Sequence, residues 1–491
     1  MSRGSHMKNS GADELARKMK VKLDKDNFPE WYSEIVELSG LVDKRYPIKG
    51  MNVWLPYGWE LMRNIDEVIR REMRKTSHKE VCFPLLIPQS EFQKEADHIK
   101  GFSDEVYWVT HGGSTPLDIP LLLRPTSETA MYPMFSLWVR SHSDLPLKIF
   151  QIVNVFRYET KQTRPFIRMR EIHFFEAHTC HRDFEEAEKQ IQEDLEIMDS
   201  VAKELCLPYL KLVRPEWDKF AGAFYSVGID TLMPSGRTLQ IASIHQYKDN
   251  FARAYRIMYE DESGEHRYAH QTTYGMSERL IGAVVGMHGD NRGIVLPPAV
   301  APIQVIVVPI PKKGMKEVVE EEALKVKEEL AGAGMRVEID LRDLRPGAKF
   351  YDWELKGVPL RLEIGTRDIE EEVVTAVKRN TFEKRKIPIK ELLKSVKELL
   401  DEVQRELYSA AENFLKEHIF TVRNLKDEAE AYRGIEGVIR VNWCGDMKCA
   451  EELEVSLDKS FLGFPPEEKP DGPCAVCGGK AAEVVYLSKS Y

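Results

Sequence analysis

The sequence has no long apolar run, few cysteines and no excess of positive charge. A membrane-spanning helix needs about 18 or more consecutive apolar residues, and no run reaches that length, so we expect a soluble protein with no membrane partner. The 70 Lys and Arg residues against 80 Asp and Glu residues give a net charge of −10. This balance excludes a protein that binds nucleic-acid backbones through overall basic charge. The 30 Gly and 26 Pro residues follow no repeating triplet, which excludes a collagen-like fibre.

Targeting segments and a disulfide framework are also missing. Residues 1–7 (MSRGSHM) contain neither an apolar leader core nor an Arg-rich amphipathic pattern and resemble an expression tag. Of the seven cysteines, four lie in the last fifty residues. A disulfide-stabilised secreted fold is therefore not expected, and a reducing cytoplasm is the expected location.

Familiar nucleotide-binding and kinase motifs are absent as well. No Gly-x4-Gly-Lys-Ser/Thr loop occurs, and residues 332–334 (GAG) lack the third glycine of a dinucleotide fingerprint. Residues 181–183 (HRD) imitate a kinase catalytic loop, but no downstream Asn or Asp-Phe-Gly supports it. We interpret this triplet as the polar start of a helix.

The chain length predicts about three domains at roughly 150 residues each. Prolines at positions 297, 298 and 302 mark a boundary, after which strand, helix and strand patterns at 305–308, 316–330 and 336–341 are typical of an α/β domain. A long helical pattern over 390–417 then leads to the cysteine-rich end. We predict an expression tag at 1–7 and three domains, at 8–300, 301–405 and 406–491.

Within the first large domain the apolar pattern predicts several elements. Apolar residues every four positions predict a helix over 59–79, followed by a proline-containing edge or interface strand at 81–88. Two β-rich segments at 147–158 and 172–179 predict a hairpin with an Arg-rich loop at 160–171. An acidic amphipathic helix is expected at 183–205, and a strand passing into a helix at 271–287.

The cysteines near the end have the spacing of a metal site. Two pairs, x4-spaced and x2-spaced, are separated by 24 residues, and each pair can turn two thiolates toward one tetrahedral ion. The predicted ligands of a structural Zn²⁺ are Cys444, Cys449, Cys474 and Cys477. The alternative is four unrelated thiols. We expect the other three cysteines, Cys82, Cys180 and Cys206, to be core residues.

Arginines and carboxylates gather around the predicted hairpin. Arg157 and Glu159 end its first strand, the loop carries Arg164, Arg168 and Arg170, and Glu176 and His178 lie in the second strand. Arg279 follows far downstream at the head of a helix. Several converging guanidinium groups would hold a triphosphate, because each can donate hydrogen bonds to two phosphate oxygens. The alternative is that each arginine is a solvated surface charge.

These segments resemble the three signature motifs of class II aminoacyl-tRNA synthetases: a helix and strand ending at Pro84, the hairpin sequence 156–159 (FRYE), and 275–279 (GMSER). Residues 124–128 (RPTSE), 174–178 (FFEAH), 219–223 (KFAGA) and 353–359 (WELKGVP) resemble the prolyl-tRNA synthetase family of the archaeal and eukaryotic type. The resemblance extends from about Asn27 to the end of the chain.

The resemblance implies an α+β catalytic domain with a six-stranded antiparallel sheet and flanking helices. It also implies an α/β anticodon-binding domain, a small zinc-containing α+β C-terminal domain, and a homodimer formed through the first motif. The implied activity is ATP-dependent attachment of L-proline to tRNA(Pro) through prolyl-adenylate, with Mg²⁺ as the counter-ion of the phosphates. No editing domain is expected between residues 179 and 271.

Three alternatives remain open. One is another synthetase of the same subclass, specific for threonine or serine, although the Cys and His zinc ligands of a threonyl enzyme are not found near these motifs. A second is a non-catalytic tRNA-binding paralogue, although Arg157, Glu159 and Arg279 are all present. A third is a zinc-dependent nucleic-acid-binding module, which leaves the first three hundred residues unexplained.

The resemblance also implies residue roles. Arg157, Glu159 and Arg279 would act in catalysis. The expected proline contacts are Thr126, Glu128, Arg157, Phe174, Glu176, His178 and Phe220. The expected ATP contacts are Arg157, Glu159, Arg168 or Arg170, Gln240 and Arg279. Ile172 stands where the general pattern usually has an aromatic residue under adenine.

Two further regions, both far along the sequence from these residues, are expected to contact tRNA or the active site. The implied anticodon contacts are Glu354, Arg361, Arg367 and Asp368, whose carboxylates and guanidinium groups suit guanine edges. A basic stretch at 378–379 and 384–386 would steer tRNA or lie on a solvated face. The terminal carboxylate of Tyr491 would fold back toward the active site.

Overall fold

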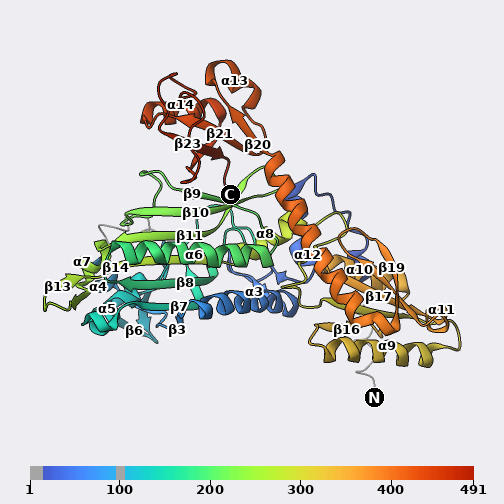
Figure 1. Cartoon of the computed structure of the whole chain (residues 1–491). Helices are drawn as coiled ribbons and strands as arrows, with labels where there is room; N and C mark the ends of the chain where they lie inside the picture. Colours follow the sequence, from blue (N-terminus) through green and yellow to red (C-terminus); the bar gives the residue numbers. More distant parts are fainter. Residues whose placement is uncertain (1–14, 95–104) are drawn as a thin grey trace.

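The computed structural model describes residues 15–94 and 105–491, so the tag predicted at 1–7 lies outside the described residues. Figure 1 shows a broad sheet with its helices in the predicted catalytic domain, the predicted anticodon-binding domain to one side and the small C-terminal domain above the sheet. The long helix α12 (Leu392–Glu417) connects these last two domains. The predicted fold class is confirmed in all three parts.

The catalytic sheet contains seven strands in the order β3-β7-β8-β14-β11-β10-β9. Six are antiparallel neighbours, as expected, and the short β3 (Lys79–Glu80) adds a seventh strand parallel to β7. The antiparallel strands are β7 (Leu147–Phe156), β8 (Glu171–His181), β14 (His270–Ser277), β11 (Thr238–Lys248), β10 (Tyr225–Leu232) and β9 (Leu210–Val213). The hairpin predicted from the β-rich segments is the β7–β8 pair.

Helices pack against this sheet through the apolar positions that the sequence indicated. In α3 (Pro56–Lys75), Leu61, Ile65, Ile69 and Met73 are at most 1% exposed, which confirms the predicted helix face. The helix α6 (Phe184–Glu204) begins where Asp183 accepts a hydrogen bond from the Glu186 amide, so the HRD triplet leads into a helix as predicted, although its first residue, His181, still belongs to β8. The helices α2 (Phe28–Leu38) and α8 (Arg279–His288) complete the same core.

The segment predicted as a strand at 81–88 is only partly regular. Leu86–Pro88 forms β4, which pairs with β6 (Thr115–Leu123), and β6 pairs with β5 (Trp108–Gly112). The preceding residues have no strand structure. The core position expected for Cys82 is wrong, because this segment follows the outside of the domain and leaves the thiol exposed. Cys180 and Cys206 are buried, as expected.

Smaller elements fill the periphery of the catalytic domain. They are β1 (Val42–Asp43), β2 (Val53–Trp54), α4 (Gln89–Gln93), α5 (Glu128–Trp138), α7 (Asn250–Tyr255), β12 (Met258–Glu260) and β13 (His266–Tyr268).

The anticodon-binding domain has a five-stranded sheet in the order β16-β15-β17-β18-β19. The first three strands are parallel and the last two are antiparallel. Its strands are β15 (Val305–Ile310), β16 (Val337–Ile339), β17 (Leu360–Gly365), β18 (Val373–Lys378) and β19 (Lys384–Pro388), and its helices are α9 (Lys316–Gly332), α10 (Pro346–Leu355) and α11 (Thr366–Glu370).

The C-terminal domain packs back onto the edge of the catalytic sheet. It contains β20 (Ile419–Val422), β21 (Val438–Trp443), β22 (Ser460–Gly463) and β23 (Glu483–Ser488), with α13 (Leu425–Tyr432) and α14 (Met447–Leu457). The Val213 amide donates to the Phe464 carbonyl at 2.9 Å, and the Thr238 amide donates to the Lys489 carbonyl at 2.8 Å. These contacts bring the end of the chain beside the catalytic sheet (Figure 1). Across residues 15–94 and 105–491, no helix combines the length and apolarity that crossing a membrane requires.

Candidate active site

Two adjoining cavities open on one face of the antiparallel sheet. The inner cavity has a volume of about 260 Å³ and the outer cavity about 230 Å³. They share Arg157, Phe174, Gln240, Ser243 and Gly275 as a common wall. These residues come from the end of β7 and from strands β8, β11 and β14, which are neighbours in the sheet. A ligand in one cavity therefore lies directly beside a ligand in the other.

The inner cavity contains every residue that the sequence analysis assigned to proline. They are Thr126, Glu128, Arg157, Phe174, Glu176, His178 and Phe220. The structure thus brings together residues that are up to 94 positions apart in the chain.

Glu176 lies at the base of the inner cavity and is held in its ionised form. Its carboxylate accepts hydrogen bonds from the Ser127 amide at 3.1 Å, the Ser127 hydroxyl and the Gln151 side-chain amide at 3.0 Å. His178 Nε2 lies 3.2 Å away. Burial alone would raise the pKa of Glu176, but the His178 contact and these hydrogen bonds lower it.

A second carboxylate stands next to it. Glu128 accepts hydrogen bonds from the Thr126 hydroxyl and, at 3.2 Å, from the Tyr247 hydroxyl. The ligand atoms of Glu128, Glu176 and His178 lie within 4.8 Å of one another, and all three residues are buried. Two buried carboxylates favour a cation, while Phe174 and Phe220 offer apolar walls. The inner cavity therefore suits a small cyclic ammonium compound.

Arg157 separates the two cavities and lines both. Its Nε donates to the Pro125 carbonyl at 3.1 Å, and its guanidinium carbon lies 6.0 Å from the centre of the Phe174 ring. Burial lowers the pKa of Arg157, and the charges of Glu105, Glu128, Glu176 and Glu278 oppose that shift. A fixed cation at this wall can face anionic groups in both cavities at once.

The outer cavity is lined by Glu159, Arg168, Gln240 and Arg279 among others. Arg279 is held by hydrogen bonds to the Ile167 carbonyl at 2.9 Å and the Gln240 carbonyl at 3.1 Å. Burial, followed by the nearby charge of Arg157, lowers the pKa of Arg279 to about 10, so the group is still cationic at neutral pH. Three arginines converge here, which is the arrangement that a triphosphate requires.

Arg170 does not line either cavity. Its guanidinium carbon lies 4.5 Å from the centre of the Tyr158 ring, and its Nε donates to the Glu159 carbonyl at 2.9 Å. Arg168 instead lines the outer cavity, 3.7 Å from Glu159. Of the two loop arginines offered for the terminal phosphate, only Arg168 is thus placed to reach a ligand. The aliphatic Ile172 lines the same cavity at the position where an aromatic residue is usual.

Several residues of this site were not identified from the sequence. His245 lines the inner cavity, and burial lowers its pKa to about 3, so its ring is neutral and bonds Ser226 at 2.8 Å. Gln151 and Ser127 orient Glu176. The signal for Ser127 was its position inside the 124–128 motif, and the signal for Gln151 was its polarity with two apolar residues on either side.

The predicted anticodon residues fall into two groups. Glu354 and Arg361 are joined by an ion pair at 2.8 Å and line a small cavity with Arg379 and Phe382. Arg367 is exposed on α11, and Asp368 is part of the same helix, where it accepts a hydrogen bond from the Gly365 amide at 2.8 Å. The structure therefore brings the first pair together and places the second pair beyond the end of β17.

The four clustered cysteines meet in the C-terminal domain. Their sulfur atoms all lie within 4.8 Å of one another, and those of Cys444 and Cys477 are 3.8 Å apart. A tetrahedral Zn²⁺ with bonds of about 2.3 Å separates its sulfur ligands by about 3.8 Å. The donor set and its spacing fit one zinc ion.

Tyr491 lies near the active site but outside both cavities. Its amide donates to the Thr238 carbonyl at 3.1 Å, its hydroxyl bonds Ser235 at 2.7 Å, and its ring lies 5.6 Å from the Arg164 guanidinium carbon. The chain end thus contacts the same loop that supplies Arg168.

Comparisons with known proteins agree with this architecture. Residues 107–288 match the tRNA synthetase class II core domain (G, H, P, S and T), and residues 304–399 match an anticodon binding domain. The fold and site are therefore those of a class II aminoacyl-tRNA synthetase. Residues 427–491 match the C-terminal domain of prolyl-tRNA synthetase.

Full-length relatives define the family further. The proline–tRNA ligase of Pyrococcus abyssi is 55% identical over 95% of this chain and 98% of its own length, and that of Methanosarcina mazei is 50% identical over 95% and 98%. The Giardia lamblia prolyl-tRNA synthetase in complex with prolyl-adenylate superimposes with a TM-score of 0.92 at 37% identity, covering 96% of this chain and 99% of that one. The chain belongs to the proline–tRNA ligase family.

Proposed function

We propose that this chain attaches L-proline to tRNA(Pro) in two steps, with prolyl-adenylate as the intermediate. The observation that carries this proposal is the wall shared by the two cavities. Arg157 faces a cation-selective, ring-sized cavity on one side and an arginine-lined cavity on the other. The proline carboxylate and the α-phosphate of ATP would therefore meet at one guanidinium group. Arg157, Glu159 and Arg279 are the proposed catalytic residues.

The inner cavity recognises proline by charge and shape. The secondary ammonium of proline would bind Glu128, Glu176 and Thr126, and its ring would pack between Phe174, His178 and Phe220. The lowered pKa of Glu176 keeps that carboxylate charged. Its partners Ser127 and Gln151 also fix its orientation, so little reorganisation is needed when proline binds.

The first step needs stabilisation of charge more than proton transfer. The proline carboxylate attacks the α-phosphate of ATP and pyrophosphate leaves, so negative charge develops on phosphate oxygens. Arg157, Arg168 and Arg279 would stabilise this charge, Glu159 would contact the adenine amino group, and Gln240 would touch the adenylate. Mg²⁺, when bound, neutralises part of the phosphate charge. In the second step the 3′-terminal hydroxyl of tRNA attacks the adenylate, and no residue is assigned as its base.

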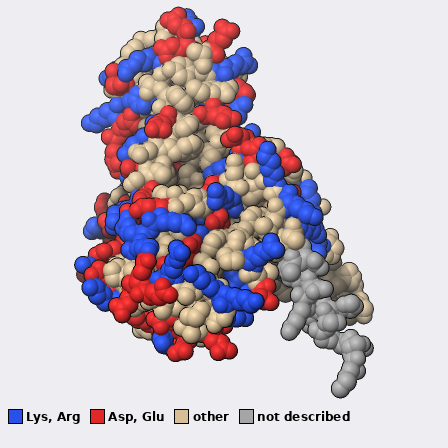
Figure 2. Space-filling view, turned by 90° about the vertical axis from the view of Figure 1, so that its right-hand side faces the viewer, with Lys and Arg blue, Asp and Glu red and all other residues tan. Residues whose placement is uncertain are grey.

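The anticodon-binding domain would recognise the tRNA through Glu354, Arg361, Arg367 and Asp368. Lys378 and Arg379 are buried in ion pairs, so of the basic stretch only Lys384, Arg385 and Lys386 present their charges at the surface. Figure 2 shows positive and negative groups interspersed over this side of the molecule. Electrostatic steering of tRNA would therefore be local.

An exposed apolar surface supports the proposed homodimer. A cavity of about 640 Å³ is lined mainly by apolar residues of the first motif and of α5. Nearby side chains are exposed although apolar: Leu85 38%, Leu86 42%, Met134 36%, Leu137 60% and Trp138 43%. Adjacent apolar surface of this kind marks protein interfaces. A second copy of the chain, bound through the first motif, would cover it.

The remaining proposals concern the zinc ion and the compartment. Cys444, Cys449, Cys474 and Cys477 would hold Zn²⁺ with no open coordination position, so its role would be structural. Free thiols in the described residues and the need for tRNA and ATP support a cytoplasmic location.

The decisive test is amino-acid-dependent ATP–pyrophosphate exchange with proline, threonine, serine, alanine and cysteine. We expect kcat/KM for proline to exceed each of the others by about 10²-fold or more, because the inner cavity combines charge with ring-sized walls. A higher value for threonine or serine would support another synthetase of this class. No exchange with any of the five would support a non-catalytic paralogue.

A further inference from the structure

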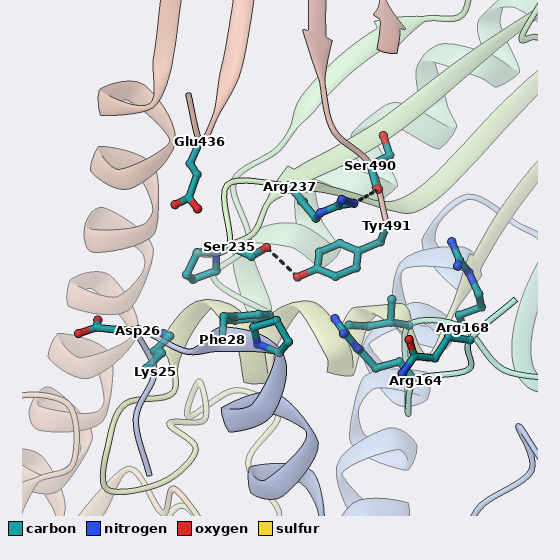
Figure 3. Close-up of a pocket in the computed structure, with 14 residues that line it drawn as sticks. Lys25, Asp26, Phe28, Arg164, Arg168, Ser235, Arg237, Glu436, Ser490 and Tyr491 are labelled. Atoms are coloured by element: carbon teal, nitrogen blue, oxygen red, sulfur yellow. Dashed lines mark hydrogen bonds between the residues drawn. The ribbon is translucent and has the colours of Figure 1, made fainter. Parts of the chain in front are cut away.

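A further cavity, of about 860 Å³, lies beside the outer cavity where five segments of the chain meet (Figure 3). We call it the junction cavity. Its wall is formed by the segment that leads into α2, the loop between β7 and β8, the turn between β10 and β11, Glu436 just before β21, and the end of the chain. Ile167 and Arg168 line both the junction cavity and the outer cavity. A ligand in the junction cavity would therefore touch the wall of the proposed ATP site.

Packed backbone, rather than mobile side chains, forms one side of this cavity. Gly236 in the β10–β11 turn has φ +71°, and a Cβ added there would lie 2.3 Å from Glu436 Cβ of the C-terminal domain. The Gly437 amide donates to the Gly236 carbonyl at 3.1 Å. Figure 3 shows the Ser235–Tyr491 and Arg237–Ser490 hydrogen bonds that close the same side, at 2.7 and 2.9 Å. The cavity is therefore built by the contact between the two domains.

The charges around the cavity are separated. Arg164 and Arg168 lie on one side and Asp26 and Glu436 on the other, with Arg237 beside the chain end (Figure 3). The Nζ of a further lining cation, Lys25, donates to the carbonyl oxygens at the end of α8 and is already occupied.

The groups around Tyr491 indicate the charge at one end of the cavity. Burial raises the pKa of its hydroxyl, while the Ser235 hydrogen bond and the charges of Arg164 and Arg237 oppose this rise. One end of the cavity is therefore basic even though the terminal carboxylate belongs to the same residue.

We propose that the junction cavity receives magnesium pyrophosphate as it leaves the outer cavity, an inference that rests on the proposed adenylate-forming function. A guanidinium group can donate hydrogen bonds to two oxygens of a diphosphate at once, so Arg164, Arg168 and Arg237 are suited to bind this ligand. Mg²⁺ keeps several of its waters, and these would face Asp26 and Glu436. The volume falls within the range of about 300–1,000 Å³ that is usual for small-molecule sites. Because Arg168 faces both cavities, it would contact the leaving group on either side.

The proposal is tested with magnesium methylenediphosphonate, whose carbon bridge prevents its use in the reverse reaction. Inhibition of tRNA charging by this analogue is measured against ATP. The parent protein should show mixed inhibition, because the analogue binds the outer cavity in competition with ATP and the junction cavity without competition. In Arg237→Gln the non-competitive inhibition constant should rise at least tenfold, while Arg237→Lys should stay within threefold of the parent. Arg405→Gln, an exposed arginine on α12, is the matched control and should change neither constant.

Three results would overturn the proposal. The first is purely competitive inhibition in the parent. The second is an unchanged non-competitive constant in Arg237→Gln. The third is a raised KM for tRNA in that variant with the parent's inhibition pattern retained, which would assign the cavity to the tRNA 3′ end. Absence of proline-dependent exchange in the parent is a different result, since it refutes the proposed function itself.

Discussion

Asp290 and Arg379 join the catalytic and anticodon-binding domains through two parallel hydrogen bonds of 2.7 Å each. Asp290 follows α8, the helix that begins with Arg279 of the outer cavity. The side chain of Arg379 is 2% exposed, and its Nε also donates to the Glu354 carbonyl at 2.8 Å. A bidentate ion pair with a buried arginine therefore connects the end of an active-site helix to the residue proposed to contact the anticodon.

We predict that Asp290→Asn impairs tRNA charging more than proline activation. Loss of this pair would let the anticodon-binding domain shift, and a displacement of about 1 Å can cost up to 10²-fold in rate. Charging should fall at least tenfold, mainly through KM for tRNA, whereas ATP–pyrophosphate exchange should stay within threefold. Asp343→Asn, an exposed position in the anticodon-binding domain, is the control. An equal loss in both assays would contradict a positioning role.

Arg157→Ala should abolish adenylate formation without unfolding the protein. The guanidinium lines both cavities, so it would contact the proline carboxylate and the α-phosphate where charge develops. Removal of one such donor costs on the order of 10²- to 10³-fold in kcat. Proline-dependent exchange measures the loss, and circular dichroism checks the fold. Activity within a few-fold of the parent would show that the proposed role is wrong.

Glu278 should make stability depend on pH. Burial raises its pKa from 4.5 to about 8, and its Oε2 has no hydrogen-bond partner among the described residues. The pKa of Glu278 is higher in the folded state than in the unfolded state, so proton binding by Glu278 favours folding. This contribution to the free energy of unfolding is full below about pH 4.5 and is lost as the pH rises through about 8.

We therefore expect Glu278→Gln, which is neutral at every pH, to gain stability relative to the parent as the pH rises. Its Tm should exceed that of the parent by at least about 2 °C at pH 9, the shift that about 1 kcal/mol produces in a domain of this size. At pH 5 the advantage should be absent. A difference in Tm that is the same at both pH values would rule out titration of Glu278.

The cysteine cluster predicts one Zn²⁺ per chain. Cys474→Ser removes one of four thiolates, and structural zinc sites contribute directly to folding. Metal analysis of protein prepared without chelator should give close to one equivalent for the parent and a clearly lower value for the variant. Protease digestion should release fragments of the region after residue 406 before the catalytic domain is cut. Less than a quarter equivalent of zinc in the parent would refute the site.

The regular parts of this molecule were predictable from the sequence because periodic burial leaves a periodic pattern. The face of α3 and the β7–β8 hairpin are examples. The choice between Arg168 and Arg170 was not predictable, because the loop between these strands reverses at Phe166, whose φ is +61°, and no periodicity encodes that turn. The contact of Arg214 with the Leu462 carbonyl was also missed, since it joins residues 248 positions apart in two different domains.

The inner cavity should activate alanine to a detectable extent. Its aromatic walls favour a ring, but they exclude a smaller side chain only weakly, because each missing methylene is worth about 1–3 kcal/mol. Removal of wrongly attached alanine from tRNA(Pro) would then need a hydrolytic site. Between Thr179 and Gln271, the chain forms only α6, α7 and strands β9–β13, all of which belong to the catalytic domain, so this interval contains no separate editing domain. Preformed Ala-tRNA(Pro) should therefore be deacylated no faster with the protein than in buffer alone. Hydrolysis clearly above the buffer rate would reveal a second active site elsewhere in the chain.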